Sequence, residues 1–396
     1  MSTEAQTKRA TLMLVCGEPS GDLLGAQLMA GLKALDPKVK IIGVGGAAMA
    51  REGLQSLFSL DVTAVMGLRE VVPAIPRILA RVKQASEFAL VTRPDAVVLI
   101  DSPDFTHRIA RRIKRSDPSI RTVNYVAPQV WASRAYRAKA MARYFDLVLA
   151  LFPFEVPFFQ RYGVKARFVG HPVIERRARM TGGAALRARL GIAPEAPLLA
   201  LLPGSRRSEI RFIFPVFRAA VELLARRVPG LVTVLPTLPH VAAKVREGAG
   251  AWPTPLHILE NEDDKYAAFD AADAALAASG TVTAELALAR TPMVVAYRVG
   301  GLTYALANHL MTVPYMTLVN ILLERPVVPE FKQHAATPPG LADELEKLLT
   351  NSAAAAAQVE AMNVFAQALG EGQETPSLRA ARVLLDFVAD RFSGLV

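Results

Sequence analysis

Apolar residues in this chain fall into short runs, separated by small or polar residues and by segments of helical pattern. Runs of this kind are typical of strands buried on both faces of a parallel sheet. Segments with apolar residues at three- and four-residue spacing, such as 23–35 and 378–392, indicate helices. The alternation predicts an α/β fold. The expected strands are 12–16, 39–44, 96–100, 122–126, 145–151, 166–169, 198–202, 231–235, 256–258, 274–278 and 293–297.

An Arg- and Ala-rich segment without a strand pattern divides the chain. We take 176–197 as a linker between an N-terminal Rossmann-like domain, 1–175, and a C-terminal one, 198–396. With 396 residues, of which 52% are hydrophobic, the chain is long enough for two cores. We expect the two domains to face one another across a cleft. The last helices are expected to pack on the N-terminal domain or on a second subunit.

Composition excludes several classes of protein. Cys16 is the single cysteine, so no intramolecular disulfide forms. Lys8 and Arg9 precede an apolar run, but Glu18 follows at once, and we expect a first strand rather than a signal peptide. No run of 18 apolar residues is present, so no membrane-spanning helix is expected.

The strongly positive net charge of the chain favours binding of a negatively charged partner. The formal net charge is +10 and the pI is near 9.8. Nucleic acid, anionic lipid and phosphorylated substrates would all satisfy it. We find no zinc-ligand spacing, RNA-binding signature or recognition-helix pattern, and therefore expect no nucleic acid partner.

The stretch 274–299 carries the clearest candidate site. An apolar run ends in Ser279, Gly280 and Thr281, and a helical pattern with Glu285 one turn inside follows. Such a turn presents free N–H groups and the positive end of a helix dipole, which suits a phosphate. Glu285 would then accept the hydroxyls of a ribose. The alternative is a tight turn in which Ser279 or Thr281 caps the helix.

Two more Gly/Ser turns follow expected strands. Ser205 and Arg206 follow the run 198–202 and lead into a helix, a second geometry suited to an anion. Ser20, Gly21 and Asp22 follow the first strand, where a substrate would lie. That turn lacks the Gly-Lys-Ser/Thr end of a P-loop, so ATP binding is not indicated.

Asp101 is the candidate general base. It stands at the carboxyl tip of the expected strand 96–100, and such a carboxylate points to where α/β proteins bind ligands. A strand-end Asp is also a common turn former, and that alternative stays open.

An amphipathic segment lies at 65–83. Its apolar positions include Val71, Val72, Ile75, Ile78 and Leu79, and the other side carries arginines and a lysine. The two prolines in the segment, at 73 and 76, predict two short helical pieces. The segment either packs on the domain core or lies on an anionic bilayer and collects a lipid substrate.

Seven motifs together resemble the lipid-A-disaccharide synthase family. The resemblance implies a GT-B glycosyltransferase that moves 2,3-diacylglucosamine, with inversion, from its UDP derivative to 2,3-diacylglucosamine 1-phosphate, giving a β-1,6-linked disaccharide and UDP. The motifs are co-linear and are GEPSGD (17–22), VMGLREV (65–71), IDSPDF (100–105), NYVAPQVWA (124–132), LLPGSR (201–206), ASGTVTAE (278–285) and the segment 320–333.

The resemblance implies roles for particular residues. Asp101 would deprotonate the acceptor's 6-hydroxyl. The turn after the first strand, with Ser20, Gly21 and Asp22, would belong to the acceptor side. The residues that would bind UDP are Ser205, Arg206, Ser279, Gly280, Thr281, Glu285 and Asn320.

The resemblance also implies partners and a location. We expect a UDP-linked diacylglucosamine donor, a phosphorylated diacylglucosamine acceptor and an anionic membrane surface, with no cofactor and no metal. The expected location is the cytoplasm, at the surface of the inner membrane, and a homodimer is left open. Two alternatives stay: a UDP-N-acetylglucosamine transferase or epimerase, and a non-catalytic nucleotide- or lipid-binding protein, in which Asp101 would be dispensable.

Overall fold

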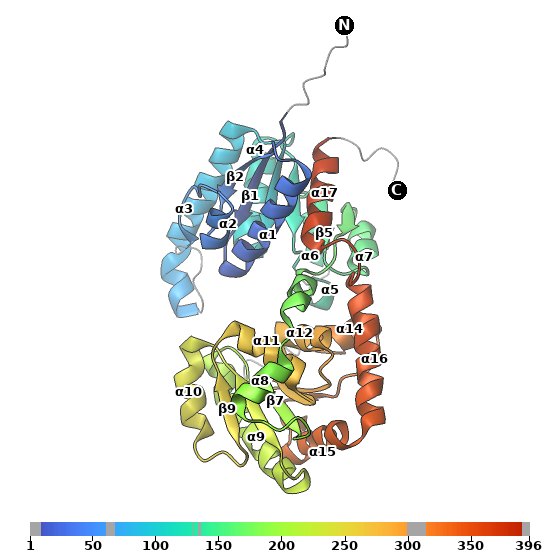
Figure 1. Cartoon of the computed structure of the whole chain (residues 1–396). Coiled ribbons are helices and arrows are strands. Elements are labelled where there is room, and N and C mark those ends of the chain that lie inside the picture. Colours follow the sequence, from blue (N-terminus) through green and yellow to red (C-terminus); the bar gives the residue numbers. More distant parts are fainter. Residues whose placement is uncertain (1–8, 61–67, 129, 134–135, 299–313, 390–396) are drawn as a thin grey trace. The chain divides into compact units, whose positions relative to one another are not determined.

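The chain folds into two compact units, each with its own sheet. A computed structural model describes residues 9–60, 68–128, 130–133, 136–298 and 314–389 (Figure 1). The first unit is Met1–Pro172 together with Gly372–Val396, and the second is Val173–Glu371. The segment 176–197, which we predicted to be a linker, lies inside the second unit. There the side chain of Arg187 donates to the carbonyl oxygen of Ala271 and holds α8 (Gly183–Leu190) in place.

The first unit contains a six-stranded parallel sheet of order β2-β1-β3-β4-β5-β6. Its central strands are buried along their whole length, as expected for a sheet with helices on both faces. The strands are β1 (Thr11–Cys16), β2 (Lys40–Val44), β3 (Ala96–Ile100), β4 (Thr122–Tyr125), β5 (Leu147–Ala150) and β6 (Ala166–Phe168).

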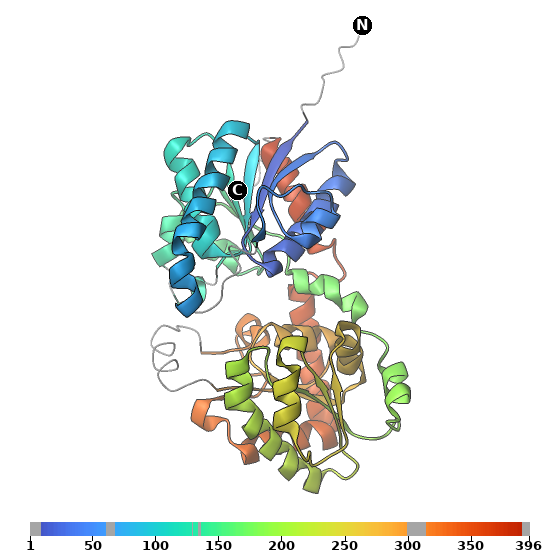
Figure 2. The same cartoon turned by 90° about the vertical axis from the view of Figure 1, so that its left-hand side faces the viewer.

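Helices cover both faces of this first sheet. Figure 2 shows α3 and α4 on one side and α1 with α17 on the other. The helices are α1 (Pro19–Leu35), α2 (Ala47–Arg51), α3 (Leu68–Thr92), α4 (Pro103–Ser116), α5 (Val130–Ser133), α6 (Tyr136–Met141), α7 (Glu155–Arg161) and α17 (Pro376–Val388).

The last helix packs on the first unit of its own chain. A Cβ atom at Gly31 in α1 would lie 2.9 Å from the carbonyl oxygen of Ser377 in α17, so glycine permits this close approach. The side chain of Arg121 donates to the carbonyl oxygens of Phe387 and Val388. Helix α17 therefore completes the first unit, which is one of the two packings expected for the last helices, although the C-terminal domain predicted for 198–396 included this helix.

The second unit repeats the parallel design, in the order β12-β11-β10-β7-β8-β9. Its strands are β7 (Leu198–Leu202), β8 (Val232–Pro236), β9 (Leu256–Leu259), β10 (Ala274–Ala278), β11 (Met293–Tyr297) and β12 (Glu330–Lys332). Its helices are η2 (Pro172–Arg179), α8, α9 (Arg207–Arg227), α10 (Pro239–Ala249), α11 (Glu262–Ala271), α12 (Thr281–Ala289), α14 (Leu318–Leu323), η3 (Gln333–Ala335), α15 (Pro338–Thr350) and α16 (Ser352–Ala368). Of these, η2 begins one residue before the boundary between the two units.

The two Rossmann-like sheets and all eleven expected strands are confirmed, with ends that differ by up to two residues. The expectation missed β12, which is three residues long and only half-buried, so that it leaves no continuous apolar run.

The prediction of two short helices at 65–83 is wrong. A single helix, α3, runs through Pro73 and Pro76 from Leu68 to Thr92. Both prolines lie in its first three turns, whereas its later turns bury Val82, Ala85, Ser86 and Ala89 and pack on α4. This packing supports the weaker amino-terminal part. Within the part of the chain that the structure describes, no helix combines the length and the apolar character needed to cross a membrane.

A histidine without charge is buried in the first unit. His107 of α4 lies 3.2 Å from the Tyr144 hydroxyl through Nδ1, and its Nε2 is buried with no partner among the described residues. Burial, together with the positive charges of Arg111 and Arg137, lowers the pKa of His107 to about 3. The folded chain therefore keeps this ring neutral.

We expect His107 to make the protein sensitive to acid. As the pH is lowered from 7 to 5, the unfolded chain binds a proton at His107 and the folded chain does not. This residue therefore lowers the free energy of unfolding by about 2 kcal/mol over that range. Urea denaturation of the full chain should show a smaller loss in His107→Gln. The exposed His334 supplies the control, because His334→Gln should lose as much as wild type. Equal losses in all three proteins would contradict the assignment.

Candidate functional site

Each sheet has one place where the strand order reverses. These switch points lie between β1 and β3 in the first unit and between β7 and β10 in the second. Parallel sheets bind ligands beyond the carboxyl ends of strands at such points, because loops there diverge to opposite faces. The residues predicted for substrate or catalysis, apart from Asn320, lie in the loops after these four strands or in the first two turns of the helices that follow them.

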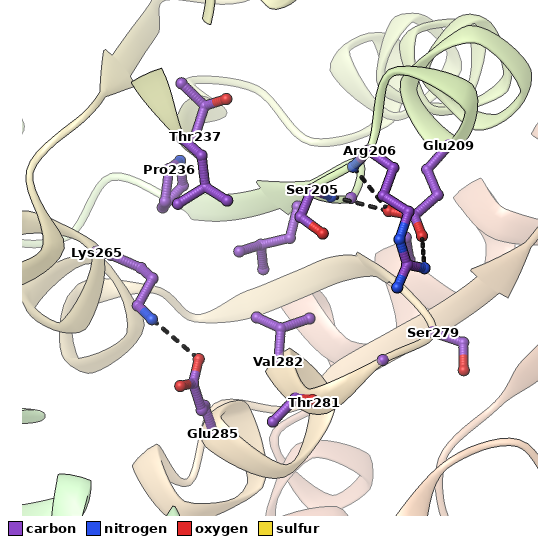
Figure 3. Close-up of a pocket in the computed structure, with 15 residues that line it drawn as sticks. Ser205, Arg206, Glu209, Pro236, Thr237, Lys265, Ser279, Thr281, Val282 and Glu285 are labelled. Carbon is purple, nitrogen blue, oxygen red and sulfur yellow. Dashed lines mark hydrogen bonds and ion pairs between the residues drawn. The ribbon is translucent and has the colours of Figure 1, made fainter. Parts of the chain in front are cut away.

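A cavity of about 320 Å³ opens at the switch point of the second unit. Figure 3 shows Ser205 and Arg206 on one side of it and Ser279 and Thr281 on another. Six of the seven residues predicted to bind UDP line it: Ser205, Arg206, Ser279, Gly280, Thr281 and Glu285. The rest of the lining is Leu202, Gly204, Glu209, Pro236, Thr237, Leu238, Lys265, Ala278 and Val282.

The amino end of α12 faces this cavity uncapped. The N-cap residue is Gly280, which has no side chain to accept the first N–H groups of the helix, and no other side chain in the described part of the chain accepts them. The alternative in which Ser279 or Thr281 caps the helix is therefore wrong. A Cβ atom at Gly280 would have nothing within 4 Å, so the backbone of the turn borders open space. This is the geometry that binds a phosphate at a helix end.

The corresponding turn at α9 is already occupied by a carboxylate. Glu209 accepts hydrogen bonds from the backbone N–H groups of Ser205 at 2.9 Å and Arg206 at 3.1 Å, and also pairs with the Arg206 guanidinium at 2.9 Å. Gly204 has φ +108°, and a Cβ there would lie 2.5 Å from Glu209, so this position requires glycine. An anion reaches these N–H groups only if Glu209 moves away.

Glu285 is the centre of a buried ion cluster. Its side chain is 5% exposed and pairs with Arg176 at 2.5 Å and with Lys265 at 3.1 Å. The hydroxyl of Tyr266 donates to it at 3.4 Å. Burial opposes the charge of Arg176, but the charge of Glu285 and its hydrogen bond outweigh burial and raise the pKa of Arg176. Two cations thus compensate the carboxylate predicted to bind ribose.

Three residues of this region were not predicted. Lys265 reaches the cavity from α11, and Arg176 reaches Glu285 from η2, in the segment that we expected to be a linker. Thr237 follows β8 and lines the cavity, and its Oγ1 is buried with no partner among the described residues. For Thr237 the sequence offered a signal, namely a hydroxyl directly after a buried strand.

Asn320 lies outside the lining of this cavity. Its amide nitrogen donates to the Val328 carbonyl oxygen and to Glu330, both at 2.8 Å. Its side-chain oxygen accepts the backbone N–H groups of Val327 and Val328, both at 2.9 Å. Asn320 is fully buried and fixes the loop before β12, so its role toward UDP stays a prediction.

At the switch point of the first unit, Ser20 and Asp101 meet. The Ser20 hydroxyl donates to Oδ2 of Asp101 at 2.9 Å. Asp101 has φ +53° and Ser102 has φ +44°, and Val126, after the neighbouring strand, has φ +66°. Such left-handed conformations are costly for residues other than glycine and gather at functional sites. Burial, then the charge of Asp101, raise the pKa of Glu18 in the same loop.

The other two residues of the predicted acceptor turn have packing contacts. A Cβ at Gly21 would lie 3.0 Å from the Cys16 side chain and 3.3 Å from the Ile100 carbonyl oxygen. Asp22 is buried and accepts the N–H groups of Gly46, Ala48 and Met49 at 2.7 to 3.0 Å. Asp22 therefore caps α2, and its role toward an acceptor stays a prediction.

Solved structures with the same architecture define a class. A putative UDP-N-acetylglucosamine 2-epimerase from Listeria monocytogenes matches with a TM-score of 0.66 at 15% identity, covering 98% of each chain. MurG from Acinetobacter baumannii matches with a TM-score of 0.59 at 14% identity, covering 96% of this chain and 99% of that one. The fold is therefore the two-domain GT-B fold of glycosyltransferases and their relatives.

Sequence comparison narrows the class to one family. The family model for lipid-A-disaccharide synthetase matches residues 12–383. A lipid-A-disaccharide synthase from Rhodospirillum centenum is 46% identical over 97% of this chain and 96% of its own length. One from Paramagnetospirillum magneticum is 45% identical over 95% and 97%. The chain belongs to the lipid-A-disaccharide synthase family of glycosyltransferases.

The ion cluster predicts how substitutions at Glu285 affect stability. Glu285→Ala leaves the half-buried Arg176 and Lys265 without this counter-charge, and we expect a loss on the order of 2 kcal/mol in the free energy of unfolding. Glu285→Gln keeps hydrogen-bonding oxygen and should lose less. Asp343, whose side chain is 63% exposed, pairs with Arg227, and Asp343→Ala should stay within about 1 kcal/mol of wild type. Urea denaturation measures all three, and a loss in Glu285→Ala no larger than that in Asp343→Ala would contradict the cost of leaving the two cations without their counter-charge.

Proposed function

We propose that the chain transfers 2,3-diacylglucosamine from its UDP derivative to the 6-hydroxyl of 2,3-diacylglucosamine 1-phosphate. The acceptor oxygen forms the new bond to the anomeric carbon of the donor, and the bond from that carbon to the UDP oxygen breaks. The product is the β-1,6-linked disaccharide 1-phosphate, and UDP leaves with the bonding electrons. Membership of the family supports this reaction, and the cavity at the second switch point is the observation that carries it.

The donor's UDP would occupy that cavity. The free N–H groups of the α12 turn suit the diphosphate, and Glu285 suits the ribose hydroxyls. Charge builds on the leaving diphosphate as the bond breaks, and Lys265, Arg206 and the α12 dipole would stabilise it. Fold relatives support a nucleotide here, because MnaA from Staphylococcus aureus was solved with UDP and a Neisseria meningitidis 2-epimerase with UDP-N-acetylglucosamine.

Asp101 would act as the general base. Its carboxylate takes the proton of the acceptor's 6-hydroxyl as that oxygen attacks. The Ser20 hydroxyl orients the carboxylate by donating to one of its oxygens, which leaves the other oxygen for the substrate. The nearby Glu18 carboxyl would keep the local charge low when it is protonated.

The amino-terminal half of α3 would lie at an anionic membrane surface. Ile75 and Leu79, one turn apart, are 44% and 45% exposed, and Arg77 and Lys83 are exposed on the same helix. The side chains of Val71 and Val72 lie outside the described residues, and Ile78 is half-buried. Both substrates carry acyl chains, so a helix that inserts apolar residues between anionic headgroups would bring the enzyme to them.

The proposed reaction is tested by its need for a lipid acceptor. UDP-2,3-diacylglucosamine is supplied in detergent micelles with and without 2,3-diacylglucosamine 1-phosphate, and UDP and the lipid product are both followed. We expect UDP release and disaccharide formation only with the acceptor. UDP release without acceptor, or UDP binding without turnover, would overturn the proposal in favour of an epimerase-like enzyme or a binding protein.

Asp101→Asn should separate catalysis from nucleotide binding. We expect turnover to fall by about 100- to 10 000-fold, the usual contribution of a general base. The Kd for UDP, measured by calorimetry, should stay within about twofold because the cavity belongs to the other unit. Asp104, an exposed carboxylate in the first turn of α4, three residues farther on, gives the matched control, and Asp104→Asn should keep near wild-type turnover. Turnover by Asp101→Asn at that level would refute the base assignment.

Substitutions on α3 test the membrane surface. Ile75→Glu combined with Leu79→Glu should lower partitioning onto vesicles of anionic phospholipid at least tenfold, because two inserting side chains are lost and two charges of the wrong sign are added. Val91, at the other end of α3, is 82% exposed, and Val91→Glu should leave partitioning unchanged. Co-sedimentation measures it, and equal partitioning of all three proteins would rule out this part of α3.

A further inference from the structure

Three aromatic side chains gather at the carboxyl edge of the first unit's sheet. Trp131 comes from α5, and Phe152 and Phe154 come from the loop after β5. Trp131 meets Phe154 edge to face at 4.9 Å between centroids, and Phe152 stacks on Phe154 at 5.5 Å. Phe152 is buried, whereas Trp131 and Phe154 are half-buried. We call these three residues the aromatic wall.

One buried carboxylate ties this wall together. Trp131 donates through Nε1 to Oε1 of Glu155 at 3.0 Å. The backbone N–H groups of Leu151 and Phe152 donate to Oε2 at 2.9 and 3.1 Å. Glu155 thus joins the loop after β4 to the loop after β5, and it is only 2% exposed.

The wall lies on the same edge as Asp101. Strands β3, β4 and β5 are neighbours, so their carboxyl ends are adjacent. The backbone N–H of Asp101 donates to the carbonyl oxygen of Tyr125, the last residue of β4, at 3.0 Å. Trp131 follows six residues later. An apolar surface at this place suits the apolar part of a ligand whose hydroxyl reaches Asp101.

The carboxyl group of Glu155, the first residue of α7, has a raised pKa. Burial outweighs its three hydrogen bonds and raises the pKa of Glu155 to about 7. Within α5, β5, α7 and the strand β6 that packs on α7, the other charged residues are Arg161, at the far end of α7, and Arg167 of β6. The titratable neighbour is His171, whose ring packs on Phe152 at 5.3 Å between centroids.

We propose that Glu155 is a positioning residue, which fixes the aromatic wall for contact with the apolar part of the acceptor. This inference rests on the proposed function, because it takes the first unit as the acceptor side. Burying a carboxylate costs desolvation free energy, so an apolar side chain would fill this space better. A carboxylate that accepts three N–H groups, one of them from the Trp131 indole, instead fixes the orientation of that ring. Glu155 acts through Trp131 and Phe152, not on the reacting atoms.

Fluorescence tests the link between Glu155 and Trp131. The chain has two tryptophans, so Trp252→Phe leaves Trp131 as the sole reporter. The full-length Trp252→Phe protein should show a transition in emission near pH 7, as Glu155 loses its proton and accepts the indole N–H more strongly. The transition should vanish with Glu155→Gln and persist with His171→Gln. Its persistence in Glu155→Gln, or its loss in His171→Gln, would overturn the proposal.

Kinetics test the consequence for the acceptor. At pH 8, Glu155→Gln should raise the KM for the acceptor about tenfold and leave kcat and the donor KM within threefold. Trp131→Phe removes the N–H donor but keeps a ring, and in that background Glu155→Gln should add little. An unchanged acceptor KM, or equal losses in kcat and in stability, would reduce Glu155 to a structural residue. If the wild-type chain forms no disaccharide at all, the proposed function fails, while the fluorescence titration of the Trp252→Phe protein still decides the Glu155–Trp131 link.

Discussion

Carboxylates that accept backbone N–H groups from a loop hold the carboxyl edges of both sheets in place. In a parallel sheet every strand-to-helix loop lies at the carboxyl edge, and the backbone N–H groups of these loops have no hydrogen-bond acceptor in a neighbouring strand. Asp22 accepts three of them at the start of α2, Glu155 accepts two after β5, and Glu209 accepts two after β7. A hydrogen bond to a charged acceptor is about twice as strong as one between neutral groups. The loops that surround the candidate sites are therefore fixed before any ligand arrives.

Asp101 differs from these carboxylates, and the difference suits a base. Its side chain accepts a hydroxyl, from Ser20, whereas Asp22, Glu155 and Glu209 each accept at least two backbone N–H groups. A carboxylate that is saturated by N–H donors has little capacity left for a substrate proton. The positive φ of Asp101 turns the chain away from the strand directly at this residue. At the edge of the first sheet, the donors thus distinguish Asp22 and Glu155 from Asp101, the carboxylate that we propose as the base.

The sequence predicted those features that depend on residues close together in the chain. Buried parallel strands are continuous apolar runs, and Asp101, Ser205 and the 279–281 turn follow such runs closely, so the sequence alone located them at the switch points of the two sheets. Lys265 and Arg176 could not be found in this way, because they reach Glu285 from other elements and their own neighbours carry no strand-end signal. The two prolines, Pro73 and Pro76, led to the wrong prediction of two short helices for a related reason. The packing that supports α3 lies farther along that helix, mostly beyond the segment 65–83 that the prediction considered.

The cluster around Glu285 would let one cavity receive both the diphosphate and the ribose of the proposed donor. An isolated buried carboxylate would repel the phosphates and would be costly to desolvate. Paired with Arg176 and Lys265, Glu285 belongs to a cluster with a formal charge of +1, which attracts an anion and adds to the positive end of α12. Hydrogen-bond capacity remains, because Oε2 has Lys265 as its donor among the described residues and a carboxylate oxygen accepts two. Because Arg176 and Lys265 balance the charge of Glu285 without removing it, this carboxylate would accept the ribose hydroxyls beside the proposed phosphate site.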